Sequence, residues 1–438
     1  MIAKIKLKFV NLKSFDWKLW ISLVALALVP AIYQVIRTYL LSTNVSSTGI
    51  DIVGQMEWFD LIDETIKAFL IVPLYSILNK LLVIDRNNLG THIFKMGLVV
   101  FILYFIFNIC VLVYGFNLIS FMNPETNDIS AMKTYLQLET IAFMIGIIPS
   151  FINVVFVTLD KSKNIYIFLG LQVILGIISD FLLIPFLGVN GIAISNMITN
   201  SVLAVSGILV LYFEGYLKAS LFKKEDKQLS LDWLKTGLFS GTQQLIDNIV
   251  YALMIARMVN MVLEQGNYWV ANNFIWGWLL IPVTALGEVI KSDCKKDYSN
   301  LTQSNYYLIS MFIFIVWSLS ISLWIPFFKG LEKLENYEEI FLITIKLVPF
   351  YIAYTLCVIP DSIFIGIGKT YFNAINSFLV NFLYYGLWYI FYVSGLIDFS
   401  MDIIIMMFGF GMIFHELISI IEERLFLNHQ MKKKANNY

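Results

Sequence analysis

Long apolar runs dominate this sequence and constrain its fold more than any other feature. A helix needs about 20 consecutive apolar residues to cross the hydrocarbon core of a bilayer. Twelve such runs follow one another along the 438 residues, so we predict an all-α integral membrane protein of about twelve transmembrane helices. The expected spans are 17–41, 56–82, 92–121, 132–159, 163–185, 188–214, 233–263, 268–291, 303–327, 338–366, 370–396 and 402–427.

The composition excludes most other classes of protein. Hydrophobic residues make up 59% of the chain and charged residues only 14%, whereas an ordinary soluble domain carries about 25% charged residues. The net charge of −1 offers no basic excess for nucleic acid. Cys110, Cys294 and Cys357 have the spacing of neither a disulfide framework nor a metal motif. We therefore expect the lipid bilayer, and no nucleic acid, as the macromolecular partner.

Lysine and arginine predict the orientation of the helices. Cytoplasmic loops carry an excess of these residues. With the N-terminus inside, 23 of the 30 fall in cytoplasmic segments and only Lys133, Lys329 and Lys333 fall outside. The first apolar run lacks a small-residue cleavage site, so we read it as a retained helix rather than a signal peptide. The expectation is a multi-pass protein of the plasma membrane with both termini in the cytoplasm.

A charged loop divides six predicted helices from six, and the halves are weakly similar. Pro73 in FLIVPLYSILNK corresponds to Pro282 in LLIPVTALGEVIK. Corresponding helices of the two halves are six helices apart, so both halves have the same orientation in the membrane. This predicts two pseudo-symmetric lobes as parallel repeats, with the substrate cavity between them. The expected segments are an N-lobe at 1–214, a cytoplasmic linker at 215–232, a C-lobe at 233–427 and a cytoplasmic tail at 428–438.

Two carboxylates of the second half, Asp247 and Asp361, mark candidate positions that together would form a C-lobe site. Asp247 shares one face of the seventh helix with Gln243, Gln244 and Asn248, which indicates a cavity wall. A buried carboxylate there can bind and release a proton near neutral pH. Asp361 follows a proline in the tenth helix; either a freed carbonyl beside the carboxylate binds a cation, or the proline merely kinks the helix.

The first half carries intramembrane charges as well, and such groups are costly unless paired or hydrated. Asp63 and Glu64 follow Asp60 on one face of the second helix, where either can pair with Lys67. This face either lines an acidic vestibule suited to cations or is the solvated start of the helix. Further substrate-cavity candidates are Gln34 with Arg37, the latter expected to partner a carboxylate, and, at second rank, Glu139 and Glu288.

Several motifs resemble one known family. IISDFLLIPFLGVNGIAISNMITNS resembles the fifth and sixth helices of MATE (multidrug and toxic compound extrusion) transporters, with Asp180 and Ser195 at matching positions. GLFSGTQQLIDNIV is similar to the family's seventh helix, with Asp247 at the acidic position of NorM-type members. IGIGKTYFNAI resembles the turn that opens its eleventh helix. The chain departs from the pattern at Asn44 and Gly176, so the family's N-lobe cation site is only partly present.

The resemblance implies a monomeric secondary transporter that works by alternating access. It would export an amphipathic organic, cationic solute in antiport with H⁺ or Na⁺, with Asp180, Asp247 and Asp361 coupling the ion and Ser195 in the cavity. No other cofactor or metal is expected. We expect no enzyme, since the sequence contains no P-loop or nucleophile motif. The alternative is a flippase for a lipid-linked saccharide, as in the Wzx and MurJ kinds of the same superfamily, with Arg37 and Arg257 binding pyrophosphate.

Overall fold

The computed structural model describes residues 15–45, 47–125, 128–217, 227–297 and 303–436, and all regular elements in these ranges are helices. Two compact units divide the chain. We call Ile36–Gly266 the N-terminal unit, and Met1–Val35 with Asn267–Tyr438 the C-terminal unit. The predicted lobe boundaries stay a prediction. The N-terminal lysines up to Lys13 and residues 218–226 of the predicted linker 215–232 lie outside the described residues.

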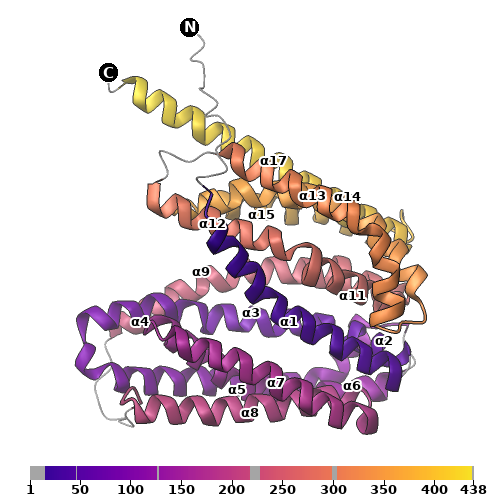
Figure 1. Ribbon diagram of the computed structural model, residues 1–438, viewed down its shortest axis with the longest axis horizontal. Coiled ribbons are helices and arrows are strands. Elements are labelled where there is room, and N and C mark those ends of the chain that lie inside the picture. Colours follow the sequence, from indigo (N-terminus) through magenta and orange to yellow (C-terminus); the bar gives the residue numbers. More distant parts are fainter. Residues whose placement is uncertain (1–14, 46, 126–127, 218–226, 298–302, 437–438) are drawn as a thin grey trace. The chain divides into compact units, whose positions relative to one another are not determined.

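The N-terminal unit contains most of the first seven predicted spans, and several of its long helices run roughly parallel or antiparallel to one another (Figure 1). The first helix, α1 (Trp17–Asn44), passes from the C-terminal unit into it. The other elements are α2 (Ser47–Gln55), α3 (Glu57–Leu70), α4 (Val72–Ile84), the 3₁₀ turn η2 (Arg86–Asn88), α5 (Leu89–Met122), α6 (Ile129–Thr158), α7 (Ser162–Leu187), α8 (Val189–Phe213), α9 (Lys227–Tyr251), the π-helical turn η3 (Ala252–Ala256) and α10 (Arg257–Met261).

The C-terminal unit holds the remaining predicted spans. Three of its spans contain a π-helical turn, as the seventh span does at η3. Its elements are α11 (Gln265–Phe274), η4 (Ile275–Leu279), α12 (Ile281–Asp297), α13 (Gln303–Pro326), η6 (Phe327–Leu331), α14 (Tyr337–Gly366), α15 (Tyr371–Leu379), η7 (Val380–Tyr385), α16 (Gly386–Val393) and α17 (Met401–Asn436). The last helix continues beyond the predicted end at residue 427 into the expected tail.

The predicted membrane spans agree closely with these helices. Within the described residues, ten helices are long and apolar enough to cross a membrane, and the bent pair Gln265–Leu279 and Ile281–Cys294 raises the number to eleven. The predicted seventh span, 233–263, is helical from α9 to α10 but is not among them. Its polar face, which includes Gln243, Gln244 and Asp247, lowers the mean hydropathy of this helix.

Proline breaks two spans at the positions that the internal similarity paired. Pro73 lies in the first turn of α4, directly after the break at Ile71. Pro282 likewise lies in the first turn of α12, after a break at Leu280 that bends the span by 47°. Proline fits the first helical turn because its missing N–H has no intrahelical acceptor there. The two prolines thus produce the same local feature in both halves of the chain.

The core of the N-terminal unit lies among α4, α5, α6 and α8. Leu74, Leu78 and Val155 are among its fully buried side chains, and Tyr104 also belongs to it. The outward surfaces of these helices remain strongly apolar, as Ile106 and Phe213 illustrate. An apolar exterior of this kind suits contact with lipid rather than water.

Glycines allow two close approaches in this unit. Gly237 and Gly241 of α9 lie four residues apart against α3, and a Cβ at Gly241 would lie 2.2 Å from the ring of Phe69. Small residues at this spacing let transmembrane helices approach closely. Gly188 joins α7 to α8 with φ +59°, a conformation that favours glycine. A Cβ at Gly191 would lie 2.8 Å from the backbone of α7, so the start of α8 packs closely against the end of α7.

The C-terminal unit packs α14 against α12, α13 and α17. Tyr351 and Leu347 of α14 are fully buried. Gly409 of α17 lies under the ring of Phe350, where a Cβ would approach to 2.2 Å. The indole N–H of Trp20 at the start of α1 donates to the Pro282 carbonyl at 2.9 Å, which attaches the beginning of the chain to this unit. The close contact between α14 and α17 positions the residues that surround Asp361.

Candidate functional site

A buried ion pair connects α1 and α7 in the N-terminal unit. Arg37 Nε donates to Asp180 Oδ2 at 2.9 Å and Nη2 donates to Oδ1 at 3.3 Å. Asp180 has no exposed surface because it shares the inward face of α7 with Gly176 and Ile184. The expectation that Arg37 partners an intramembrane carboxylate is therefore confirmed. A guanidinium held by both carboxylate oxygens satisfies the charge of Asp180 within the protein.

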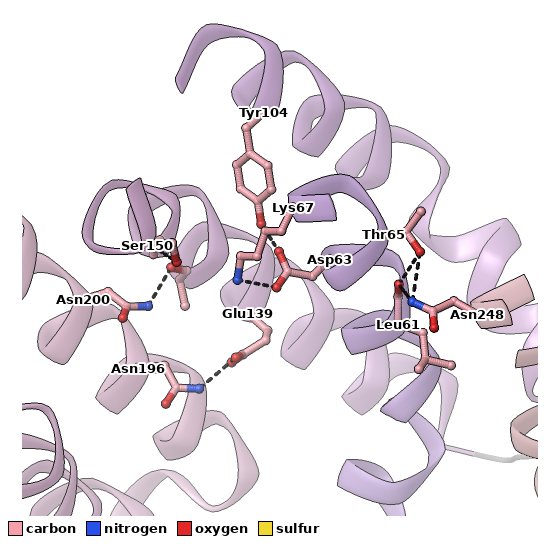
Figure 2. Close-up of polar contacts among 12 residues, drawn as sticks. Leu61, Asp63, Thr65, Lys67, Tyr104, Glu139, Ser150, Asn196, Asn200 and Asn248 are labelled. Atoms are coloured by element: carbon pink, nitrogen blue, oxygen red, sulfur yellow. Dashed lines mark hydrogen bonds and ion pairs between the residues drawn. The ribbon is translucent and has the colours of Figure 1, made fainter. Parts of the chain in front are cut away.

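The polar contacts continue from Arg37 to a second carboxylate. Arg37 Nη2 also donates to Asn196 Oδ1 at 2.9 Å, and Asn196 Nδ2 donates to Glu139 Oε1 at 2.8 Å. Figure 2 shows Asn196 reaching toward Glu139 from α8. Glu139 is 5% exposed, and its Oε2 has no hydrogen-bond partner among the described residues. A continuous chain of polar groups thus joins α7, α1, α8 and α6.

Asp63 forms a second buried cluster close to Glu139 in Figure 2. Lys67 Nζ lies 2.5 Å from Asp63 Oδ2, and the Tyr104 hydroxyl donates to the other oxygen of Asp63. The ammonium group also lies 5.6 Å from the centroid of the Phe143 ring. Of the two pairings that the sequence allowed for Lys67, the structure has the one with Asp63. Glu64, one position on, turns toward the exposed side of the helix.

The charges of this buried set do not balance. Three carboxylates of the N-terminal unit are buried among its described residues: Asp63, Glu139 and Asp180. The basic side chains that the structure places against them are Arg37 and Lys67. With both cations paired, Glu139 is the carboxylate left with a neutral amide as its hydrogen-bond donor. An unpaired buried charge is costly, so this position favours a bound proton or cation.

The polar residues on one face of the seventh helix differ in burial: some pack against α3 and others are exposed. Asn248 is buried and donates from Nδ2 to the Leu61 carbonyl at 2.9 Å and to Thr65 Oγ1 at 3.0 Å, both on α3 (Figure 2). Gln244 Nε2 donates to Asn248 Oδ1 at 3.0 Å. Gln243 is exposed and Asp247 is half-buried. Asn248 therefore fixes α9 against α3, while Gln243 and Asp247 keep surface that a solute could contact.

The remaining predicted residues lie in varied surroundings. Ser195 is fully buried, and its hydroxyl has no hydrogen-bond partner among the described residues, so it could contribute an oxygen to a cation. Gln34 is half-buried on α1, one turn before Arg37. Glu288 forms an ion pair with Lys291 on its own helix at 2.7 Å. Asp361 is half-buried in the C-terminal unit, where Ser419 Oγ donates to its Oδ1 at 3.0 Å.

Sequence reasoning did not single out two residues of the N-terminal set. Asn196 follows Ser195 directly and supplies the link between Arg37 and Glu139. Tyr104 lies within a long apolar stretch of α5, where one hydroxyl gives little signal. An asparagine in an apolar helix is costly unless it finds a partner, so Asn196 could have been noted on that ground.

Comparison with known proteins gives a structural match but no match by sequence. No protein-family model matches the chain, and no curated protein matches it. A multidrug resistance MATE family transporter of the MOP superfamily, solved in an inward-facing conformation, is similar with a TM-score of 0.78 at 16% identity, over 95% of this chain and 99% of the other. A structure with the same description in an outward-facing conformation is similar with a TM-score of 0.68 at 16% identity, over 95% of this chain and 96% of the other.

A third similar structure is a MOP superfamily transporter from Pyrococcus furiosus, for which a reversed polarity of the binding pocket is said to suggest a different function. Its TM-score is 0.70 at 16% identity, and each chain is covered to 98%. The similarity extends over nearly the whole chain in all three cases. It confirms the predicted fold class, and the fold is that of the family that the sequence motifs resembled. This chain therefore has the fold of the MATE transporters of the MOP superfamily.

Proposed function

We propose that this chain is a MATE-type secondary transporter that exports an amphipathic, cationic organic solute in exchange for H⁺ or Na⁺. Similar folds have been solved in inward- and outward-facing conformations, which supports alternating access as the mechanism. The apolar helices support a location in a membrane. The observation that carries the proposal is the buried polar chain from Asp180 through Arg37 and Asn196 to Glu139.

The coupling that we propose uses the excess carboxylate of this set. With a proton or Na⁺ near Glu139, the buried charges balance. When that ion leaves, the extra negative charge attracts a cationic solute. The ion and the solute then compete for one charge, and such competition produces exchange between them. Asp180 keeps Arg37 in place, and Ser195 is a candidate oxygen donor to a cation in the same unit.

Asp247 and Asp361 are the further coupling candidates of the proposal. The half-buried carboxylate of Asp247, with Gln243 beside it, would face the solute. The contacts of Arg37 and Arg257 give less support to a flippase. Arg37 is held by Asp180, and Arg257 Nε donates to the Phe121 carbonyl at 2.9 Å. A pyrophosphate would have to displace these contacts before it could bind either guanidinium.

Proteoliposomes loaded with a fluorescent organic cation test the proposal. An imposed pH or Na⁺ gradient is expected to accelerate efflux, and Glu139→Gln is expected to reduce the gradient-driven rate at least tenfold. Glutamine keeps an oxygen that can accept from Asn196, so the helix contacts persist. Glu214→Gln is the matched control, because Glu214 pairs with Lys161 near the end of α8 at 3.2 Å. Efflux that ignores both gradients would refute the proposal.

A further inference from the structure

The contact between α14 and α17 gathers metal-ligating side chains that the transport proposal does not use as a group. Cys357 and Asp361 lie four residues apart on α14, and His415 and Ser419 lie four residues apart on α17. Residues at this spacing share one helical face. The ligand atoms of Cys357, Asp361 and His415 all lie within 4.8 Å of one another. The two faces therefore bring a thiol, a carboxylate and an imidazole to one point.

The distances in this cluster fit tetrahedral coordination. Bonds of about 2.0–2.3 Å from zinc to nitrogen, oxygen and sulfur place tetrahedral ligand atoms about 3.3–3.6 Å apart. Cys357 Sγ lies 3.2 Å from Asp361 Oδ2, and His415 Nε2 lies 3.4 Å from the same oxygen. A metal ion could therefore enter with only small movements of these side chains.

Neighbouring groups hold the carboxylate in position. Ser419 Oγ donates to Asp361 Oδ1 at 3.0 Å, and Asn376 Nδ2 donates to Ser419 Oγ at 2.7 Å. Asn376 also donates to the His415 carbonyl at 3.1 Å. Hydrogen bonds of this kind orient the side chains that bind a metal and strengthen its binding.

Charge and access also suit a divalent ion. A thiolate and a carboxylate together carry two negative charges, and the thiol loses its proton when the metal binds. Cys357 is buried, but the side chains of His415 and Asp361 are 33% and 21% exposed, so an ion has a path to the cluster. Glu416 and Glu422 on α17 lie within electrostatic range of Asp361 and His415 and favour a cation there.

We propose that Cys357, Asp361 and His415 form a binding site for a transition-metal ion of the Zn²⁺ class. Sulfur and imidazole ligands select such ions over Na⁺, Mg²⁺ or Ca²⁺. Three protein ligands leave the fourth tetrahedral position to water. The bound ion ties α14 to α17 and occupies the Asp361 carboxylate, so it competes with any coupling ion at that residue.

Binding of Co²⁺ tests the site without a transport assay. The probe is Co²⁺ added to the purified full-length chain in detergent, with the affinity tag removed and the thiols reduced. We expect one Co²⁺ per chain, intense tetrahedral d–d bands and a thiolate-to-Co²⁺ charge-transfer band, all abolished by Zn²⁺. Cys357→Ser is expected to remove the charge-transfer band, and His415→Gln or Asp361→Asn to weaken binding at least tenfold.

Two control variants match these substitutions. Cys294→Ser changes another buried cysteine of the same unit, and His92→Gln changes a histidine that lies beside Asp85 in the other unit. Both are expected to leave the Co²⁺ spectrum unchanged. A charge-transfer band that survives Cys357→Ser, or that is lost equally in Cys294→Ser, would overturn the proposal. Absence of binding to the wild-type chain would overturn it too.

X-ray absorption at the zinc edge keeps the proposal testable if a variant does not fold. The wild-type chain loaded with one Zn²⁺ is expected to show one sulfur at about 2.3 Å and nitrogen or oxygen ligands at about 2.0–2.1 Å. A shell of only oxygen and nitrogen contradicts the site. Because these readouts measure binding alone, their failure leaves the transport proposal standing, and the failure of transport leaves the metal site standing.

Discussion

The ion pair between Arg37 and Asp180 predicts a large energetic coupling between two helices. The two charges interact over about 4 Å, which corresponds to about 4 kcal/mol at an effective dielectric constant near 20. The side chains are 13% and 0% exposed, so water can replace little of this interaction. Removing one partner of a buried pair costs about 3–5 kcal/mol, because the other charge stays buried.

A double-mutant cycle measures this coupling. We expect Arg37→Met and Asp180→Asn each to lower the free energy of unfolding by about 3–5 kcal/mol, and the double variant to lower it by clearly less than their sum. A carboxylate can take up a proton whereas a guanidinium keeps its charge, so Arg37→Met is expected to be the milder single change. The assay is equilibrium unfolding of the purified protein in mixed micelles, followed by tryptophan fluorescence.

An exposed ion pair of the same unit provides the matched control. Lys80 Nζ lies 2.8 Å from Asp232 Oδ2, a distance similar to that of the buried pair, but the side chains are 52% and 30% exposed. The same cycle on this pair is expected to give about 0.2–1 kcal/mol. If the buried pair also couples by less than about 0.5 kcal/mol, burial does not determine its strength and our reasoning is wrong.

Three further predictions follow from features of the two units. Gly241→Val is expected to prevent the close packing of α9 on α3, because a Cβ meets the ring of Phe69 at 2.2 Å, and Phe69→Ala should restore part of the lost thermal stability. Tyr104→Phe removes a donor to buried Asp63 and should lower the free energy of unfolding by about 1–3 kcal/mol in the same micelle assay. Burial raises the pKa of Glu332, just beyond a span, to about 8. As the pH rises from about 5 to 8, the free energy of unfolding of the wild type should therefore fall relative to that of Glu332→Gln, by roughly 5 kcal/mol at most. A difference in melting temperature between the two proteins that stays constant across this pH range would contradict the prediction.

The positions of the helices could be predicted from the sequence because the signal is local. The run that ends near residue 366 is apolar over the length that a bilayer requires, whatever its neighbours are. The breaks at Pro73 and Pro282 are local for the same reason. The seventh span was predicted on the same basis but is less apolar, because the polar face around Asp247 lowers its hydropathy.

The contacts of the polar residues were much harder to predict. Arg37 and Asp180 are 143 residues apart, and their pairing depends on how α1 and α7 are rotated about their own axes. Sequence reasoning could say that Arg37 needs a carboxylate but not which one. Asn196 was missed because its importance comes from two partners on other helices.

The cluster around Asp361 illustrates the same limit. Cys357 and His415 are 58 residues apart and lie on helices that are separated by another span, so no spacing in the sequence relates them. Each residue alone looks like an ordinary part of an apolar helix. Their chemistry becomes visible only when α14 packs against α17.

Glu139, the one carboxylate without a cationic partner among the buried side chains that the structure describes in the N-terminal unit, has a consequence for the energetics of exchange. One proton or one monovalent organic cation is enough to neutralise it. A cycle that carries one of these inward and the other outward through this charge moves no net charge across the membrane. Transport of a monovalent solute by this set would then respond to the pH gradient and be indifferent to the membrane potential, whereas a divalent solute would make the same cycle electrogenic.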